Sequence, residues 1–345
     1  MKNPFLFVLG CQRSGTTLLQ HILDSHPSTA VMQEAGWFGT WYEQQTGITP
    51  EGFVTADLIP NVLRTCKNID LGLSAADLLA IVGNGRSVLY QDFISAIFDR
   101  FGAARKKRLV GSKNPDYLRH LNTLHRLWLQ AKFVHIVRDG RDVCLCAGDR
   151  WNETGFQGFP FLLYESPDRV FDRWKEDPVI TTALWWEWNV GLGREFGRSL
   201  GPEMYYELRY EDLVTRPRDE CIALCEFLEI PFHEAMLRHH ENFRPRRGPG
   251  GTILHARVGL PITSGLRDWR TEMPAEELER FEAAAGVFLE ELSYPRGVEQ
   301  PQTAHLTEAT RIRALFEELA ATAGNEIRRV GTGAKNREAT ARSFR

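Results

Sequence analysis

The chain has 345 residues, of which 43% are hydrophobic, and a formal net charge of -3. This length and apolar content allow a substantial buried core. The near-even charge balance provides no overall attraction to nucleic acid or anionic lipid, so any anion site must be local. The first apolar run, residues 5–9, is far too short to span a membrane, and no signal peptide is visible. We therefore expect no nucleic-acid partner and no integral membrane segment.

The six cysteines lie mostly inside apolar runs, as in DVCLC and CIALCEF. This placement differs from the turn-rich spacing of small secreted domains, and it predicts a reducing, cytoplasmic compartment. Cys221 and Cys225 are four residues apart and could form half a metal site, but no Cys or His pair completes it nearby at finger-like spacing. We interpret them as core thiols and expect no metal.

Short β-rich runs alternate with helical patterns along the chain. The alternation predicts βαβ units, and therefore an α/β fold with a parallel β-sheet covered by helices on both faces. The predicted strands lie within residues 5–10, 107–114, 132–139 and 203–213, and the helices that follow them within 16–25, 116–129, 140–150 and 217–229.

Two segments are predicted to be insertions that shape a substrate pocket. Residues 37–100 are expected to form helices and loops between the first two strands, and 151–166 an aromatic loop that contains glycine. Insertions over the carboxyl edge of a parallel sheet commonly line such a pocket. Their aromatic residues favour an aromatic-rich pocket, with core packing as the alternative. These aromatic residues are Trp37, Phe38, Trp41, Phe156, Phe159 and Phe161.

The C-terminal third ends the predicted core. Residues 242–270, rich in Pro, Gly and Arg, predict a surface loop, and a helix follows from Pro274 to Leu292. An amphipathic helix is expected over 306–330 and a polar, basic, disordered tail over 331–345. We therefore predict one α/β domain over residues 1–300 and an appendage over 301–345. The sequence leaves open whether the chain forms a homo-oligomer.

The segment FVLGCQRSGTTLL, residues 7–19, has the frame of a nucleotide-binding P-loop. Thr16, however, stands where an NTPase has its lysine. A loop between a strand and a helix N-terminus still offers unpaired N–H groups and the positive end of the helix dipole to a phosphate. Arg13 adds a guanidinium that can bind two anion oxygens at once. The loop therefore predicts a P-loop-type sheet that binds an anionic donor without a metal.

The stretch QRSGTTLLQHILDSHP resembles the first motif of the sulfotransferases that use 3′-phosphoadenosine 5′-phosphosulfate (PAPS). It is most similar to the branch with Arg-Ser-Gly-Thr-Thr-Leu, which includes tyrosylprotein, carbohydrate and bacterial enzymes. Scattered motifs extend the resemblance over residues 4–295. It implies sulfuryl transfer from PAPS to a hydroxyl of a small-molecule, carbohydrate or lipid acceptor, by in-line displacement and without a metal. The alternatives are a P-loop small-molecule kinase and a catalytically inactive nucleotide-binding protein.

The resemblance assigns three catalytic roles. Glu34, which lies 21 residues after Arg13, would take the proton of the acceptor hydroxyl. Lys113, in LVGSKNPDYLRHL, would stabilise the leaving phosphate together with Arg13. The cytosolic branch uses a histidine as its base, so His120 and His125 are alternative bases, although we predict both at the surface of their helix.

The remaining motifs complete the predicted donor site. Arg138 follows the strand FVHIV and would bind the 3′-phosphate, while the family's serine eight residues later is replaced here by Cys146, a weaker donor. Arg141 and Asp142 read as solvated turn residues. Tyr210, in RYEDL, would contact the adenine or lie in the core. The predicted donor-binding residues are Arg13, Ser14, Gly15, Thr16, Thr17, Arg138, Cys146, Tyr210, Ser264 and Arg267.

Overall fold

The computed structural model describes residues 3–318 except 34, 36, 67–73, 83–86, 155–176, 245, 248–252 and 255. The chain divides into two compact units that are discontinuous in sequence. The first unit comprises Met1–Gly10, Gly15–Val137 and Gly193–Ser264, and the second comprises Cys11–Ser14, Arg138–Leu192 and Gly265–Arg345. The division at residue 300 stays a prediction.

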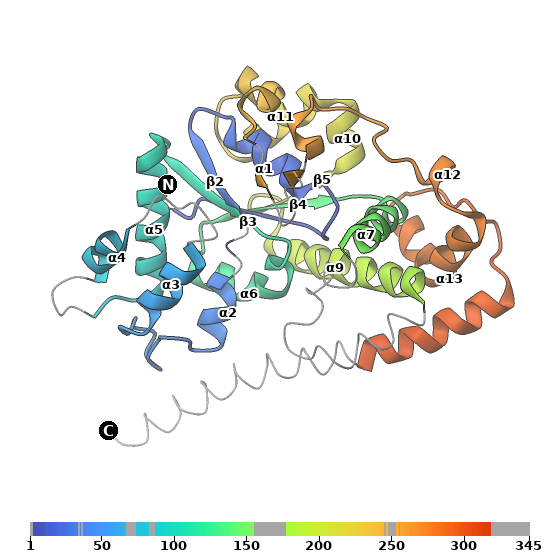
Figure 1. The fold of residues 1–345 in the computed structure, drawn as a ribbon, viewed down its shortest axis with the longest axis horizontal. Helices are drawn as coiled ribbons and strands as arrows, with labels where there is room; N and C mark the ends of the chain where they lie inside the picture. Colours follow the sequence, from blue (N-terminus) through green and yellow to red (C-terminus); the bar gives the residue numbers. More distant parts are fainter. Residues whose placement is uncertain are drawn as a thin grey trace. The chain divides into compact units, whose positions relative to one another are not determined.

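A parallel five-stranded sheet forms the centre of the first unit (Figure 1). The strand order is β2-β3-β1-β4-β5, and all four neighbouring pairs are parallel. The α/β prediction is therefore confirmed. The strands are β1 (Leu6–Leu9), β2 (Thr29–Gln33), β3 (Leu109–Lys113), β4 (Lys132–Val137) and β5 (Tyr205–Arg209). Of these, β2 was not among the predicted strands.

Helices cover both faces of this sheet (Figure 1). Because side chains alternate along a strand, neighbouring residues of β1 belong to different cores. Phe7 and Leu9 pack with one group of helices, α2 (Trp37–Glu43), α3 (Leu58–Cys66), α4 (Ala75–Val82), α5 (Tyr90–Arg105) and α6 (Tyr117–Leu127). Leu6 and Val8 pack with α1 (Thr16–Asp24), α11 (Pro217–Phe227) and the 3₁₀ helix η3 (Glu234–Asn242).

Every residue of β1 and β4 is buried, as a parallel sheet between two helical layers requires. Strands of this kind consist mainly of apolar residues, and for this reason they could be predicted from the sequence. A short helix, α10 (Tyr210–Thr215), follows β5 directly. Two 2-residue strands, β6 (Arg246–Arg247) and β7 (Ile253–Leu254), pair antiparallel, and a 3₁₀ turn, η5 (Ala256–Gly259), follows them.

The second unit is helical. It contains α7 (Gly140–Thr154), the larger part of α9 (Pro178–Leu200), α12 (Trp269–Glu272), α13 (Ala275–Glu291) and a helix over 303–318. Its core includes Trp186, which is fully buried and packs against the rings of Phe281 and Phe288. The helix over 303–318 corresponds to the start of the predicted amphipathic helix, and residues 319–345 lie outside the described part of the chain.

Arg313 joins the helix over 303–318 to the rest of the second unit. Its guanidinium donates two hydrogen bonds of 2.8 Å to the Glu187 carboxylate and one of 2.6 Å to the Ala284 carbonyl. Over the described residues, none of the helices combines the length and the apolar character needed to cross a lipid bilayer. The cytoplasmic location stays a prediction.

Candidate functional site

Two glycines bring other groups of the first unit close to the phosphate loop. A Cβ added to Gly10 would lie 2.4 Å from the Ile136 carbonyl oxygen. Gly15 has a left-handed φ of 93°, and a Cβ there would lie 2.6 Å from Cδ2 of Tyr210. Both distances are shorter than any ordinary contact, so the backbone reaches this position only without side chains. The ring of Tyr210 therefore packs directly against the last glycine of the loop.

The central part of the loop, Cys11–Ser14, belongs to the second unit. Arg13 is exposed and left-handed, with a φ of 69°, which is uncommon for a residue other than glycine. Ser14 is fully buried, and its Oγ has no hydrogen-bond partner among the described residues. A buried hydroxyl without a partner is energetically costly, and a bound phosphate oxygen would satisfy it. The loop thus fits the predicted phosphate donor.

Lys113 ends β3 and points to the first turn of α1. Its side chain is buried, with 1% of the residue exposed, and Nζ lies 3.3 Å from Oγ1 of Thr17. In the sheet, Lys113 pairs with Val8 of β1 and Gln33 of β2. Burial lowers the pKa of His21, one turn after Thr17, and the charge of Lys113 lowers it further against the opposing effect of Asp24. The Lys113 amine therefore lies at the N-terminus of the loop helix.

Glu34, the predicted base, lies outside the described residues. Its neighbours on the chain are described. Gln33 pairs with Lys113 in the sheet, and the Ala35 carbonyl accepts a hydrogen bond of 3.0 Å from the Tyr117 hydroxyl. The backbone on both sides of Glu34 is therefore tied to the segment that carries Lys113.

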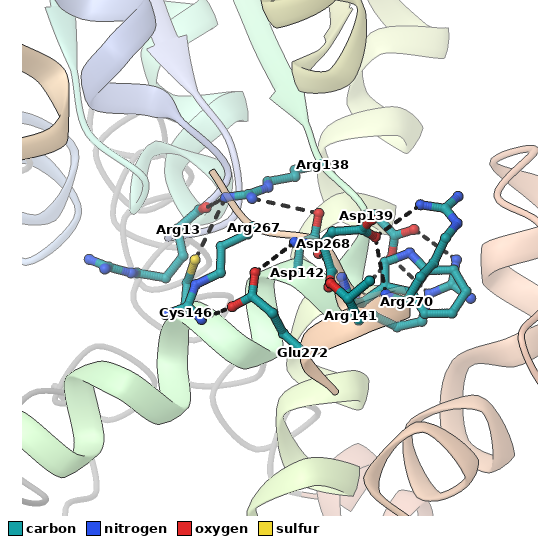
Figure 2. Close-up of polar contacts among 12 residues, drawn as sticks. Arg13, Arg138, Asp139, Arg141, Asp142, Cys146, Arg267, Asp268, Arg270 and Glu272 are labelled. Atoms are coloured by element: carbon teal, nitrogen blue, oxygen red, sulfur yellow. Dashed lines mark hydrogen bonds and ion pairs between the residues drawn. The ribbon is translucent and has the colours of Figure 1, made fainter. Parts of the chain in front are cut away.

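Arg138 is 5% exposed and contacts three groups within the second unit (Figure 2). Nη1 donates to the Arg13 carbonyl at 3.3 Å and to Sγ of Cys146 at 3.7 Å, and Nη2 lies 3.6 Å from Oδ2 of Asp142. The residue eight positions after Arg138 therefore reaches its guanidinium. The backbone N–H of Trp269, the first residue of α12, donates to the other oxygen of Asp142 at 2.9 Å.

The reading of Arg141 and Asp142 as solvated turn residues was wrong. Arg141 has no exposed surface, and Asp142 is 8% exposed. The Arg141 guanidinium bonds both oxygens of Asp139, at 3.0 and 2.7 Å, and lies 2.6 Å from Oε1 of Glu282 (Figure 2 shows the pair with Asp139). It also stacks 3.5 Å above the ring of Trp269. Glu282 and Trp269 are distant from Arg141 in sequence, so the local pattern contained no sign of them.

Ser264 and Arg267 are the predicted donor-binding residues from the C-terminal part of the chain. Ser264 is exposed and ends the first unit. Arg267 forms an ion pair with Glu272 of α12 in the second unit (Figure 2). Tyr210 is half-buried at the edge of the core, so it fits both sequence readings.

The prediction that His120 and His125 lie at a helix surface was wrong. His120 is 7% exposed, with Nδ1 at 2.8 Å from Oε2 of Glu43 and Nε2 at 3.1 Å from Oγ1 of Thr40. His125 is half-buried, and its ring packs edge-on against Phe133 and Phe196. Their side chains fill the layer between the helices and the sheet, where hydrophobic spacing alone does not identify a histidine.

The predicted aromatic pocket is replaced, where it is described, by core packing. Trp37 and Phe38 are 8% and 0% exposed, and their rings pack edge to face. Trp41 packs partly buried beside Trp37. Phe156, Phe159 and Phe161 lie outside the described residues.

Cys221 and Cys225 are buried core thiols, and burial raises their pKa values to about 12 and about 11.

Sequence reasoning did not identify Tyr117, Asp142 or Glu43, each of which contacts a predicted site residue or its neighbour. For Tyr117 a signal existed, because the segment around Lys113 was matched as K-x-P-x-Y-L-x-x-L. Nothing in the local sequence marked Glu43, whose partners His120 and Thr123 come from α6.

The chain is similar in sequence to known proteins. The chain is 27% identical over 278 residues to the protein-tyrosine sulfotransferase of Drosophila melanogaster, covering 79% of this chain and 48% of that protein. It is 24% identical over 325 residues to nodulation protein NoeE of Sinorhizobium fredii, covering 90% and 72%. The chain therefore spans about half the length of the first relative and about three quarters of the second.

A solved structure shares the fold. The sulfotransferase domain from the curacin biosynthetic pathway matches with a TM-score of 0.53 and 22% identity, over 86% of this chain and 99% of that one. A sequence model of the sulfotransferase family matches residues 4–234, which contain the phosphate loop, Lys113 and Arg138. The predicted resemblance is thereby confirmed, and the chain belongs to the sulfotransferase family.

Proposed function

We propose that the protein transfers a sulfuryl group from PAPS to an acceptor hydroxyl by in-line displacement. The observation that carries the proposal is the buried ammonium of Lys113, 3.3 Å from Thr17 at the start of the loop helix. A lysine held out of water at a phosphate loop places its charge where a leaving phosphate gains negative charge. The unpartnered Ser14 hydroxyl provides independent support for an anionic ligand.

The proposed roles follow the residues of the family motifs. PAPS, when bound, supplies the sulfuryl group and the leaving phosphate. Glu34 accepts the proton of the acceptor hydroxyl. The acceptor oxygen bonds to sulfur at the same time as the bond between sulfur and the phosphate oxygen breaks. Lys113 and Arg13 stabilise the negative charge left on the phosphate. Arg138 binds the 3′-phosphate and selects PAPS over nucleotides that lack it.

The test of this function is sulfate transfer with radiolabelled PAPS. Acceptors should include sugars, glycolipids, phenols and tyrosine peptides, the last because several relatives are named as protein-tyrosine sulfotransferases. Binding of adenosine 3′,5′-bisphosphate is measured with and without magnesium. Metal-independent binding together with transfer fits the proposal. Magnesium-dependent binding of ATP would instead indicate the kinase alternative, and binding without any transfer would indicate an inactive protein.

Replacing Glu34 with glutamine tests the proposed base. Glutamine preserves the shape but cannot accept a proton, so donor affinity should persist while kcat falls by about 100-fold or more. The fall should be smaller for acceptors of low pKa, which are partly ionised without help. Calorimetry gives the affinity, and kcat is measured with phenols of graded acidity. Glu51→Gln, at an exposed position, is the matched control. Near-normal turnover of Glu34→Gln would remove Glu34 from the mechanism.

A further inference from the structure

The hydroxyl of Tyr117 connects the chain beside Glu34 to the chain beside Lys113. It donates a hydrogen bond of 3.0 Å to the carbonyl of Ala35 and lies 2.7 Å from Oγ of Ser112. A phenol carries only one hydrogen, so in the second bond the Ser112 hydroxyl is the donor. Ala35 follows Glu34 in the chain, and Ser112 precedes Lys113.

All three groups are withdrawn from water. Tyr117, Ala35 and Ser112 each have no exposed surface. Burial raises the pKa of the Tyr117 phenol, so the hydroxyl stays protonated and remains a donor. A buried polar group is costly unless its hydrogen bonds are made, so this geometry is held firmly. The edge of its ring also packs against Phe7 of β1, which limits the movement of the phenol.

We infer that Tyr117 is a positioning residue for sulfuryl transfer. This inference rests on the proposed function. Tyr117 fixes the distance between the backbone that carries the base and the strand end that carries the lysine. The two roles must act on opposite ends of one displacement, at the acceptor oxygen and at the leaving phosphate. An error of about 1 Å in such a geometry can lower the rate by as much as 100-fold.

Tyr90 offers a matched control. It is 1% exposed, and its hydroxyl donates a hydrogen bond of 2.8 Å to the carbonyl of Phe38, within α2. Tyr90 thus also bonds to the main chain of this segment, at Phe38, four residues after Glu34. Among the described residues, its hydroxyl makes no bond to the strand of Lys113. Removing either hydroxyl leaves one buried carbonyl without this partner, and removing that of Tyr117 also leaves the Ser112 hydroxyl without its acceptor, so the loss of stability should be larger in Tyr117→Phe.

The experiment compares Tyr117→Phe with Tyr90→Phe. In Tyr117→Phe we expect kcat to fall by about tenfold or more, with the Kd of adenosine 3′,5′-bisphosphate within about twofold of the unchanged chain. Tyr90→Phe should also lower Tm, by less because only one hydrogen bond is lost, and it should keep kcat within about twofold. Ser112→Ala, which keeps the bond from Tyr117 to Ala35, should lower kcat less than Tyr117→Phe. Equal kcat in the two tyrosine variants would overturn the inference.

A second measurement separates this inference from the proposed function. Hydrogen exchange of peptides covering residues 29–36 should be faster in Tyr117→Phe than in Tyr90→Phe, whether or not the protein has been given a substrate. Equal exchange in these variants would overturn the positioning role by itself. If the unchanged protein transferred no sulfate and did not bind the bisphosphate, the proposed function would fail, and a positioning role for Tyr117 in sulfuryl transfer would fail with it.

Discussion

At the residue scale, the guanidinium of Arg138 is held by other groups of the protein. A backbone carbonyl, a thiol and a carboxylate each contact it, at 3.3, 3.7 and 3.6 Å. Two of these distances are longer than good hydrogen bonds. A phosphate, which carries negative charge, would be a stronger partner for the guanidinium than the carbonyl or the thiol.

Replacing Arg138 with alanine should separate two nucleotides. Binding of adenosine 3′,5′-bisphosphate should weaken by about tenfold or more, because a charge-assisted contact is lost. Binding of adenosine 5′-phosphate, which lacks the 3′-phosphate, should change little. Calorimetry with both ligands checks this, and Arg270→Ala, an exposed arginine in the second unit, is the control. Equal weakening for both ligands would place Arg138 outside the 3′-phosphate subsite.

Replacing Cys146 with serine tests the departure from the family motif. Sγ of Cys146 lies 3.7 Å from Nη1 of Arg138, so a hydroxyl at this position would lie beside the same guanidinium. A hydroxyl is the stronger donor, so affinity for the bisphosphate should rise modestly or stay the same. A large loss of affinity would show that the position does not face the nucleotide. Competition binding with the unchanged protein resolves such small differences.

At the scale of elements, buried charges join α7 to α12 and α13. Arg141, in the first turn of α7, forms ion pairs with Asp139 just before the helix and with Glu282 of α13. The Glu282 carboxylate also accepts hydrogen bonds from the backbone N–H groups of Gly297 and Val298, at 2.8 and 3.0 Å. Glu282 is 2% exposed. Since these charges have left water, each depends on the others for its stabilisation. The segment after β4 is therefore fixed by residues far along the chain.

Replacing Arg141 with methionine should destabilise the protein strongly. The substitution leaves two buried carboxylates without their cation, a change that typically costs about 3–5 kcal/mol. Urea unfolding followed by fluorescence measures it. Arg218→Met is the control, because Arg218 and Glu234 form an ion pair with more than half of each side chain exposed, and its loss should matter far less. Similar effects from both variants would contradict the role of burial.

The sequence predicted elements with a local signal and missed those that depend on distant partners. The run at β1 is continuous and apolar, and four of the six residues of β4 are apolar, so both strands were found. The strand β2 begins and ends on polar residues, Thr29 and Gln33, and α9 contains three glycines, which weaken its helical signal. The phosphate loop was recognisable because its chemistry is local. The burial of Arg141 was not, because Glu282 lies 141 residues away.

At the scale of the whole molecule, buried histidines connect stability to pH. Burial lowers the pKa of His135 to about 3 and that of His239 to about 4, and it also lowers the pKa values of His21 and His26. In the unfolded chain these groups titrate near 6.5. Between these limits the unfolded chain binds more protons than the native protein, so acid favours unfolding.

The free energy of unfolding should therefore decrease as the pH falls from about 6.5 towards 4.5, and it should be nearly constant from 7 to 8. Urea unfolding at a series of pH values measures this. His239→Gln can preserve the hydrogen bond to the Val258 carbonyl while removing one titrating group, so its decrease should be shallower. Stability that does not change between pH 6.5 and 4.5 would show that these histidines become protonated in the native protein.

The left-handed conformation of Arg13 is unfavourable for folding, whereas the side chain of Arg13 has a proposed role in activity. A non-glycine residue there costs roughly 1–2 kcal/mol, whereas glycine adopts the same φ of 69° freely and loses only part of that gain to its more flexible unfolded chain. A glycine at position 13 would thus stabilise the fold, but it would remove the guanidinium that is proposed to bind the anion. Evolution under selection for thermal tolerance alone would tend to discard this arginine, and only selection for catalysis would keep it.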